Sequence, residues 1–218
     1  MCNEGELLEK FNIQLSPIPL PELTAQVKKA KEEGTEVKAV MDYCKEKMNI
    51  CVTEEQLENI AALKVAMRRL ADQYGCNAVA IQCWNALQGE LGIMPCAANS
   101  LLNEEGLPVV CETDIHGAIT AVMAEAADLN RTPSFFADWT VRHPDNENGE
   151  LLQHCGPWPL SCAAEKPTIG MPLAFDYPGA VEAQAKHGLV TLCRFDGDNG
   201  EYSLLLGTAK GIDGPYTK

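Results

Sequence analysis

The segment from residue 54 to residue 128 alternates helix signals with strand signals, and this alternation constrains the fold more than any other feature of the sequence. Its longest helix is predicted over 54–74. Thr53 is placed as the N-cap, Gln56 stands at the capping-box spacing, and Gly75 supplies the C-cap signal. Apolar residues recur along this stretch at the helical period, so we expect one face to be buried.

Two short apolar runs follow, at 78–81 and 109–111. Each is apolar on both faces, as a buried parallel strand should be. Further helices are predicted over 95–103 and 115–128, so strand and helix alternate at the spacing of βαβ units. The predicted fold class is α/β, with a parallel, Rossmann-like sheet.

The chain changes character near residue 130, after which eight of its thirteen prolines occur. Apolar runs at 189–195 and 202–206 flank the turn-rich segment 196–200, which is typical of a β-hairpin. We therefore predict an α/β domain over 1–130, followed by part of an antiparallel β domain over 131–218.

The charge of the chain excludes one class of partner. With 31 acidic and 17 basic residues, the formal net charge is −14. Nucleic-acid binding depends on Lys and Arg that neutralise phosphates, so we expect no nucleic-acid partner. No apolar run is long enough to span a bilayer, and no membrane partner is expected.

Ten cysteines are distributed along the chain, and no two of them have the Cys-x-x-Cys spacing. Most lie in apolar runs, and the N-terminal sequence lacks the features of a signal peptide. We therefore expect buried, reduced thiols in a cytoplasmic protein. The pair His154 and Cys155 suggests a nucleophile, but neighbours on a strand point to opposite faces, so we discount it.

Polar residues that follow the two predicted parallel strands form the candidate site, because ligands of open α/β sheets bind beyond the carboxyl ends of the strands. Such a cluster of carboxylates, amides, an indole and an imidazole suits Mg²⁺ or Mn²⁺, or general acid–base chemistry. The candidates are Gln82, Trp84, Gln88 and Glu90 after the first strand, and Glu112, Asp114 and His116 after the second.

Each of these residues also has a structural interpretation. Asp114 stands where a helix N-cap is expected, and a cap uses the same oxygens as a metal ligand. Glu90 fits a solvated helix position, and Trp84 fits a core position. From spacing alone, the structural interpretation is favoured over the metal site.

The stretches 83–96 and 101–118 resemble the L-fucose/L-arabinose isomerase superfamily, and within it the L-fucose isomerase-like branch. The most specific part of the resemblance is Cys-Glu-x-Asp-x-x-Gly at 111–117. The helix over 54–74 and the segment 136–139 agree with it, so the resemblance covers most of the chain.

The resemblance implies a metal-dependent aldose–ketose isomerase that moves a proton through an enediol, acts on a monosaccharide and assembles as a homo-oligomer. It implies Mn²⁺ (or Mg²⁺) as cofactor. Asp114 and Glu90 match metal-binding and catalytic carboxylates, while Gln82 and Trp84 are assigned to substrate contact. A bound metal would stabilise the enediolate while a carboxylate acts as base.

The third metal ligand of the family, a histidine, has no counterpart here, because the last histidine is His187 in an unlike segment. We therefore expect a fragment with half a site and negligible isomerase activity. The alternative is a non-catalytic carbohydrate-binding or regulatory relative with the same fold. A third reading, from composition alone, is a structural domain without a ligand.

Overall fold

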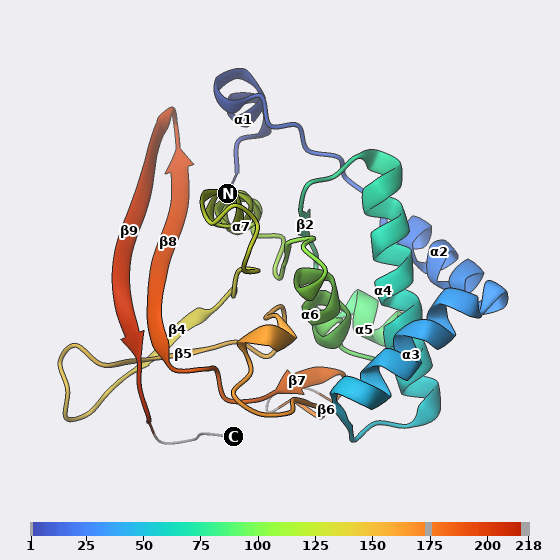
Figure 1. Cartoon of the computed structure of the whole chain (residues 1–218). Coiled ribbons are helices and arrows are strands. Elements are labelled where there is room, and N and C mark those ends of the chain that lie inside the picture. Colours follow the sequence, from blue (N-terminus) through green and yellow to red (C-terminus); the bar gives the residue numbers. More distant parts are fainter. Residues whose placement is uncertain (1, 173–175, 215–218) are drawn as a thin grey trace.

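The computed structural model describes residues 2–172 and 176–214. Helices α2, α3 and α4 form one side of the molecule, and a long hairpin of β8 and β9 forms the opposite side (Figure 1). The helices are α1 (Glu4–Phe11), α2 (Leu20–Glu33), α3 (Thr35–Lys47), α4 (Glu54–Tyr74), α5 (Ala86–Leu91), α6 (Cys96–Glu104) and α7 (Ile115–Ala127), with a 3-10 turn η1 (Leu160–Cys162).

The strands are short apart from those of the hairpin. They are β1 (Asn49–Ile50), β2 (Val79–Ala80), β3 (Val109–Val110), β4 (Asp138–Arg142), β5 (Glu150–Gln153), β6 (Thr168–Gly170), β7 (Ala180–Glu182), β8 (Gly188–Asp198) and β9 (Glu201–Gly211). One sheet has the order β1-β6-β7, and the pairs β2-β3, β4-β5 and β8-β9 form the others among the described residues.

The central helix α4 forms as the sequence predicts. The Thr53 hydroxyl accepts from the backbone N–H of Gln56, the Gln56 side chain accepts from the backbone N–H of Thr53, and Gly75 closes the helix with a φ of 64°. Lys64 interrupts the apolar face and is only 8% exposed. Its ammonium reaches Glu105 at 2.6 Å, so the charge is paired at the edge of the core while the aliphatic stem is buried.

The predicted parallel pairing is confirmed, but only in small sheets. β2 and β3 run parallel, with Val79 opposite Val109, and each strand has two residues. The sheet β1-β6-β7 is mixed, because β1 and β6 are parallel while β6 and β7 are antiparallel. The fold is therefore mixed α/β with helices and small sheets, rather than a continuous doubly wound sheet.

Contacts cross the predicted division of the chain at residue 130, and the division itself stays a prediction. β1 from the first part pairs with β6 from the second, with Asn49 opposite Thr168. Trp158, Ile169 and Val181 belong to the same buried core as the helices α2, α3 and α4. The two parts meet because backbone N–H groups at β1 donate to carbonyls at β6, from Asn49 to Pro167 and from Cys51 to Ile169.

The predicted hairpin is confirmed. β8 and β9 pair along eleven residues each, and the two-residue loop between them is Asn199-Gly200. Both loop residues have positive φ, 51° and 83°, which identifies the type I′ turn favoured by the strand twist.

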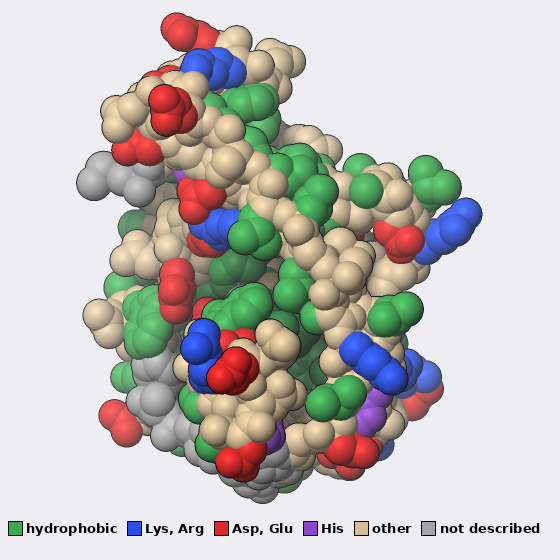
Figure 2. All heavy atoms as spheres, turned by 90° about the vertical axis from the view of Figure 1, so that its left-hand side faces the viewer, with side chains coloured by type: hydrophobic (Ala, Val, Ile, Leu, Met, Phe, Trp, Pro, Cys, Tyr) green, Lys and Arg blue, Asp and Glu red, His purple; other side chains and the backbone are tan. Residues whose placement is uncertain are grey.

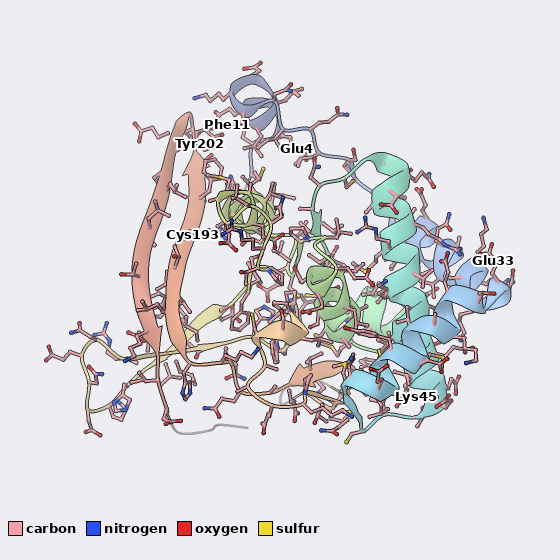
Figure 3. The ribbon with its side chains drawn as sticks, viewed as in Figure 1. Glu4, Phe11, Glu33, Lys45, Cys193 and Tyr202 are labelled. Atoms are coloured by element: carbon pink, nitrogen blue, oxygen red, sulfur yellow. The ribbon has the colours of Figure 1, made fainter. Side chains whose placement is uncertain are left out.

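The first helix packs on the tip of this hairpin. Phe11 of α1 lies edge-on to Tyr202 of β9, with ring centroids 4.9 Å apart (Figure 3). The Tyr202 hydroxyl donates to the Glu6 carboxylate at 2.7 Å, and this hydrogen bond raises the pKa of Tyr202 to about 12. Segments nearly 200 residues apart in sequence, 6 and 202, are thereby held together.

Hydrophobic side chains remain at the surface of the hairpin. Leu204, Leu205 and Leu206 are successive residues of β9, so both faces of the strand carry an exposed leucine. Figure 2 looks onto this side and shows hydrophobic side chains among scattered charged ones. None of the helices in the described part of the chain has the length and hydrophobicity that a membrane span requires.

All ten cysteines are unpaired thiols, as expected. The expectation that they are buried is only partly right. Cys51 is exposed, and several other cysteines are half-buried. Four are buried: Cys44, Cys83, Cys96 and Cys111.

Candidate functional site

An irregular turn between β3 and α7 builds the centre of the candidate site. Glu112 and Thr113 both have positive φ, 62° and 56°, which is unusual for residues with a side chain. The turn is held by backbone hydrogen bonds from Thr113 to Ile81 and from Asp114 to Cys111, each 3.1 Å long. Two successive left-handed residues are a local strain of the kind that clusters at functional sites.

Asp114 ends this turn and is the N-cap of α7. Its Oδ1 accepts the backbone N–H of Gly117 at 2.9 Å. A Cβ atom at Gly117 would lie 2.5 Å from Asp114 Oδ2 and 2.8 Å from the Phe136 ring. Glycine at this position therefore lets the carboxylate and the aromatic ring approach the helix.

Arg194, in the middle of β8, holds the other side of this carboxylate. Nη1 donates to Asp114 Oδ2 and Nη2 donates to Asp114 Oδ1, so the contact is bidentate. Asp196 lies 3.6 Å from the same guanidinium. These carboxylates raise the pKa of Arg194, with Asp114 as the larger cause, so the arginine stays charged.

A cleft of about 580 Å³ opens around this ion pair. The turn before α7, the start of α7, the segment that enters β4, and β8 form its walls. Acidic groups outnumber basic ones on the lining. The lining residues are Cys2, Glu112, Thr113, Asp114, Ile115, His116, Phe136, Ala137, Asp138, Trp139, Arg194 and Asp196.

His116 lies on the wall of the cleft with most of its ring buried. Its Nδ1 is 3.0 Å from Asp196 Oδ1, while its Nε2 is buried without a hydrogen-bond partner among the described residues. Thr120 ties the helix to the hairpin, because its hydroxyl donates to the His116 carbonyl and accepts from the Phe195 N–H. Asp196 therefore holds the ring at Nδ1, while Thr120 holds the backbone of α7 against β8.

The structure brings Glu112, Asp114 and His116, the three candidates that follow the second predicted strand, to this cleft. Of the four residues that were assigned catalytic, metal-binding or substrate roles, only Asp114 is among them. Asp114 lines it, whereas Glu90 on α5 and Gln82 after β2 are exposed outside its lining. Trp84 is 40% exposed and does not line it either, so the core interpretation of this residue is wrong. The roles assigned to Glu90, Gln82 and Trp84 stay predictions.

The donor atoms of the described residues do not fit a divalent metal in this arrangement. Both oxygens of Asp114 are engaged, by Gly117 and by Arg194, so the N-cap interpretation is confirmed. Within residues 2–172 and 176–214, no group of three or more His, Cys, Asp or Glu side chains is placed to hold a metal ion.

Arg194 is the main site residue that the sequence reasoning missed. It is the only charged residue in the run Leu192-Cys193-Arg194-Phe195, and a charge inside an apolar strand is a usable signal. Its partner Asp114 lies 80 positions earlier, so no local pattern could have identified the pair.

Comparison with known proteins finds no matching family model. Curated relatives do match. A sulfoquinovose isomerase of Alkalicoccus urumqiensis is 28% identical over 216 residues, covering 97% of this chain and 47% of that protein. A sulfoquinovose isomerase of Priestia aryabhattai is 26% identical over 223 residues, covering 99% of this chain and 49% of that protein.

A third relative, the sulfoquinovose isomerase of Clostridium sp. (strain MSTE9), is 28% identical over 162 residues. The chain spans about half the length of the first two relatives. All three relatives are sugar isomerases, which agrees with the resemblance at the level of the superfamily. None is named for fucose, so the comparisons do not support the L-fucose branch.

Proposed function

We propose that this chain is part of a sugar isomerase that interconverts an aldose and a ketose, with a sugar of the sulfoquinovose kind as substrate. The observation that carries the proposal is the similarity to sulfoquinovose isomerases along 97% of the chain. The acidic cleft supports it, since carboxylates accept hydrogen bonds from sugar hydroxyls. Glu112 and Asp138 are the carboxylates on its lining that are not engaged by Arg194.

The reaction moves a proton between two adjacent carbons through an enediol, and this chain contributes acid–base groups to it. A base must reach within hydrogen-bond distance of the proton it removes. Asp114 can act as this base only when its ion pair with Arg194 opens, because Arg194 occupies both carboxylate oxygens. Arg194 therefore sets when Asp114 is available.

The remaining expectations belong to the same proposal. Dependence on Mn²⁺ (or Mg²⁺), a homo-oligomeric assembly, a cytoplasmic location and a larger Rossmann-like sheet are proposed for the longer isomerase, in which the other half of the protein adds its own groups. The exposed leucines of β9 supply an apolar surface that a larger assembly would cover.

Turnover assays test the proposal. We expect the longer protein to isomerise sulfoquinovose, and the 218-residue chain alone to show no measurable turnover of sulfoquinovose, fucose or arabinose. Robust turnover by the isolated chain would contradict the fragment hypothesis. Sugar binding without turnover by the longer protein would favour the non-catalytic, carbohydrate-binding alternative, which the engaged state of Asp114 also favours.

A separate experiment tests metal binding by removing the ion pair between Asp114 and Arg194. Because Arg194 occupies both oxygens of Asp114, we expect the isolated chain to bind Mn²⁺ weakly and Arg194→Met to raise the Mn²⁺ affinity. A charge-assisted contact is worth ~1.5–3 kcal/mol, so the increase should be about tenfold or more in calorimetric titration.

The matched control is the double variant Arg194→Met with Asp114→Asn, in which the affinity should return to its original value. Unchanged Mn²⁺ affinity in all three proteins would remove Asp114 from the metal ligands.

A further inference from the structure

Four cysteines from four separate parts of the chain lie close together. Cys83 follows β2, Cys111 follows β3, Cys96 begins α6 and Cys155 follows β5. The two sulfurs of Cys96 and Cys155 lie 3.9 Å apart. A Cβ atom placed on Gly156 would lie 3.3 Å from the Cys96 sulfur and 3.4 Å from the Cys111 sulfur, so these two thiols lie against the glycine.

Cys155 is the most reactive candidate of the four. It is half-buried, whereas Cys83, Cys96 and Cys111 are buried. The Cys96 thiol donates to the Cys155 sulfur, and the neighbouring His154 ring also favours the thiolate; together they lower the pKa of Cys155 to about 5. The same contact raises the pKa of Cys96, which keeps its proton.

The reason given above against His154 and Cys155 as a nucleophile pair does not hold in the structure. The discount rested on strand alternation, but β5 ends at Gln153 and both residues lie beyond it. The His154 ring is held by the backbone N–H of Gly156, which donates to Nδ1 at 3.0 Å. Its Nε2 is buried without a hydrogen-bond partner among the described residues, 3.9 Å from Asp138.

We propose that Cys155 and Cys96 form an oxidisable thiol pair that a hydroperoxide converts into a disulfide. This activity is independent of the sugar isomerase proposal. The Cys155 thiolate attacks one oxygen of the peroxide, the O–O bond breaks, and water leaves once the released oxygen takes up a proton. Cys155 is then a sulfenic acid. The Cys96 thiol attacks its sulfur and a second water leaves, so two thiols and one H₂O₂ give one disulfide and two waters.

The geometry favours Cys96 as the resolving thiol. A disulfide needs a sulfur–sulfur distance of about 2.05 Å, so the two sulfurs must approach by roughly 2 Å. Gly156 follows Cys155 directly and has no side chain between the sulfurs. The bond would link the start of α6 to the segment that follows β5.

Peptide mapping of the intact chain tests this proposal. The protein is treated with H₂O₂, remaining thiols are blocked with an alkylating agent, and disulfide-linked peptides are identified by mass spectrometry. We expect the Cys96–Cys155 peptide first, forming at least about tenfold faster than oxidation of the exposed Cys51. A Cys51→Ser variant is the matched control and should give the same yield.

Variants separate the two chemical steps. In Cys96→Ser, Cys155 should stop at the sulfenic acid, which dimedone traps; in Cys155→Ser, Cys96 should stay reduced. Preferential oxidation of Cys51, or a Cys83–Cys111 bridge in place of the expected one, would overturn the proposal. Because the wild-type map decides between these outcomes, a variant that fails to fold leaves the test intact.

Discussion

Replacing Asn103 with alanine should lower the free energy of unfolding by about 3–5 kcal/mol. Asn103 is 2% exposed, and its side-chain amide pairs with both backbone groups of Val109 at 3.0 Å. β3 pairs only with β2 among the described residues, so this amide takes the place of a further strand along the other edge of β3. Alanine would orphan a buried N–H and a buried carbonyl, and would leave a cavity.

Urea denaturation of the variant measures this change. Asn77→Ala is the matched control, because Asn77 is exposed, and it should change the free energy of unfolding by no more than ~0.5 kcal/mol. A loss below about 1 kcal/mol for Asn103→Ala would mean that water satisfies the edge of β3 equally well.

Gly179→Ala should cost about 3 kcal/mol or more. Gly179 has a φ of 123°, and a Cβ atom there would lie 2.6 Å from the Met94 carbonyl oxygen. The carbonyl of Gly179 accepts from Ala97 of α6, and its N–H donates to Gly170 of β6. The backbone must therefore shift where β7 packs against α6, and these contacts are lost with it.

The comparison variant is Gly89→Ala, in helix α5, where the added Cβ meets nothing within 4 Å. This change should be neutral or should stabilise the protein by up to ~1 kcal/mol, because alanine favours the helix. Thermal melting of both variants distinguishes a strained position from a permissive one. Equal melting temperatures would show that the loop before β7 adapts without cost.

The sequence predicts well those elements whose signals are local. The capping box at Thr53, the C-cap glycine Gly75, and the Asn199-Gly200 turn each depend on residues within a few positions of one another. Such signals report the backbone directly, which is why α4 and the β8–β9 hairpin appear where they are expected.

The small sheets are not predictable in the same way. β1 has two residues and β6 has three, which is too short to show a period, and they pair across more than 100 positions. This pairing joins segments on the two sides of the predicted division at residue 130. A Rossmann-like sheet was the natural expectation from βαβ spacing, but the described strands are too short to form one continuous layer.

The candidate site likewise has one part that local sequence predicts and one part that depends on distant residues. Asp114 and its N-cap role follow from local sequence, whereas its partner Arg194 arrives from β8. The thiols of Cys96 and Cys155 meet across 59 positions in the same manner. Strand alternation, applied to Cys155, pointed away from this contact because the strand ends two residues earlier, at Gln153.

The pairing of β1 with β6 also has a consequence during synthesis. Asn49 and its partner Thr168 are 119 positions apart. At ~5–20 residues added per second, Asn49 waits on the order of ten seconds before Thr168 has been made. During this interval α3 and α4 are complete, while Ile169 and Val181, which belong to the same buried core, do not yet exist. The nascent chain therefore exposes an unfinished apolar surface on the ribosome, which chaperones that bind apolar segments would recognise.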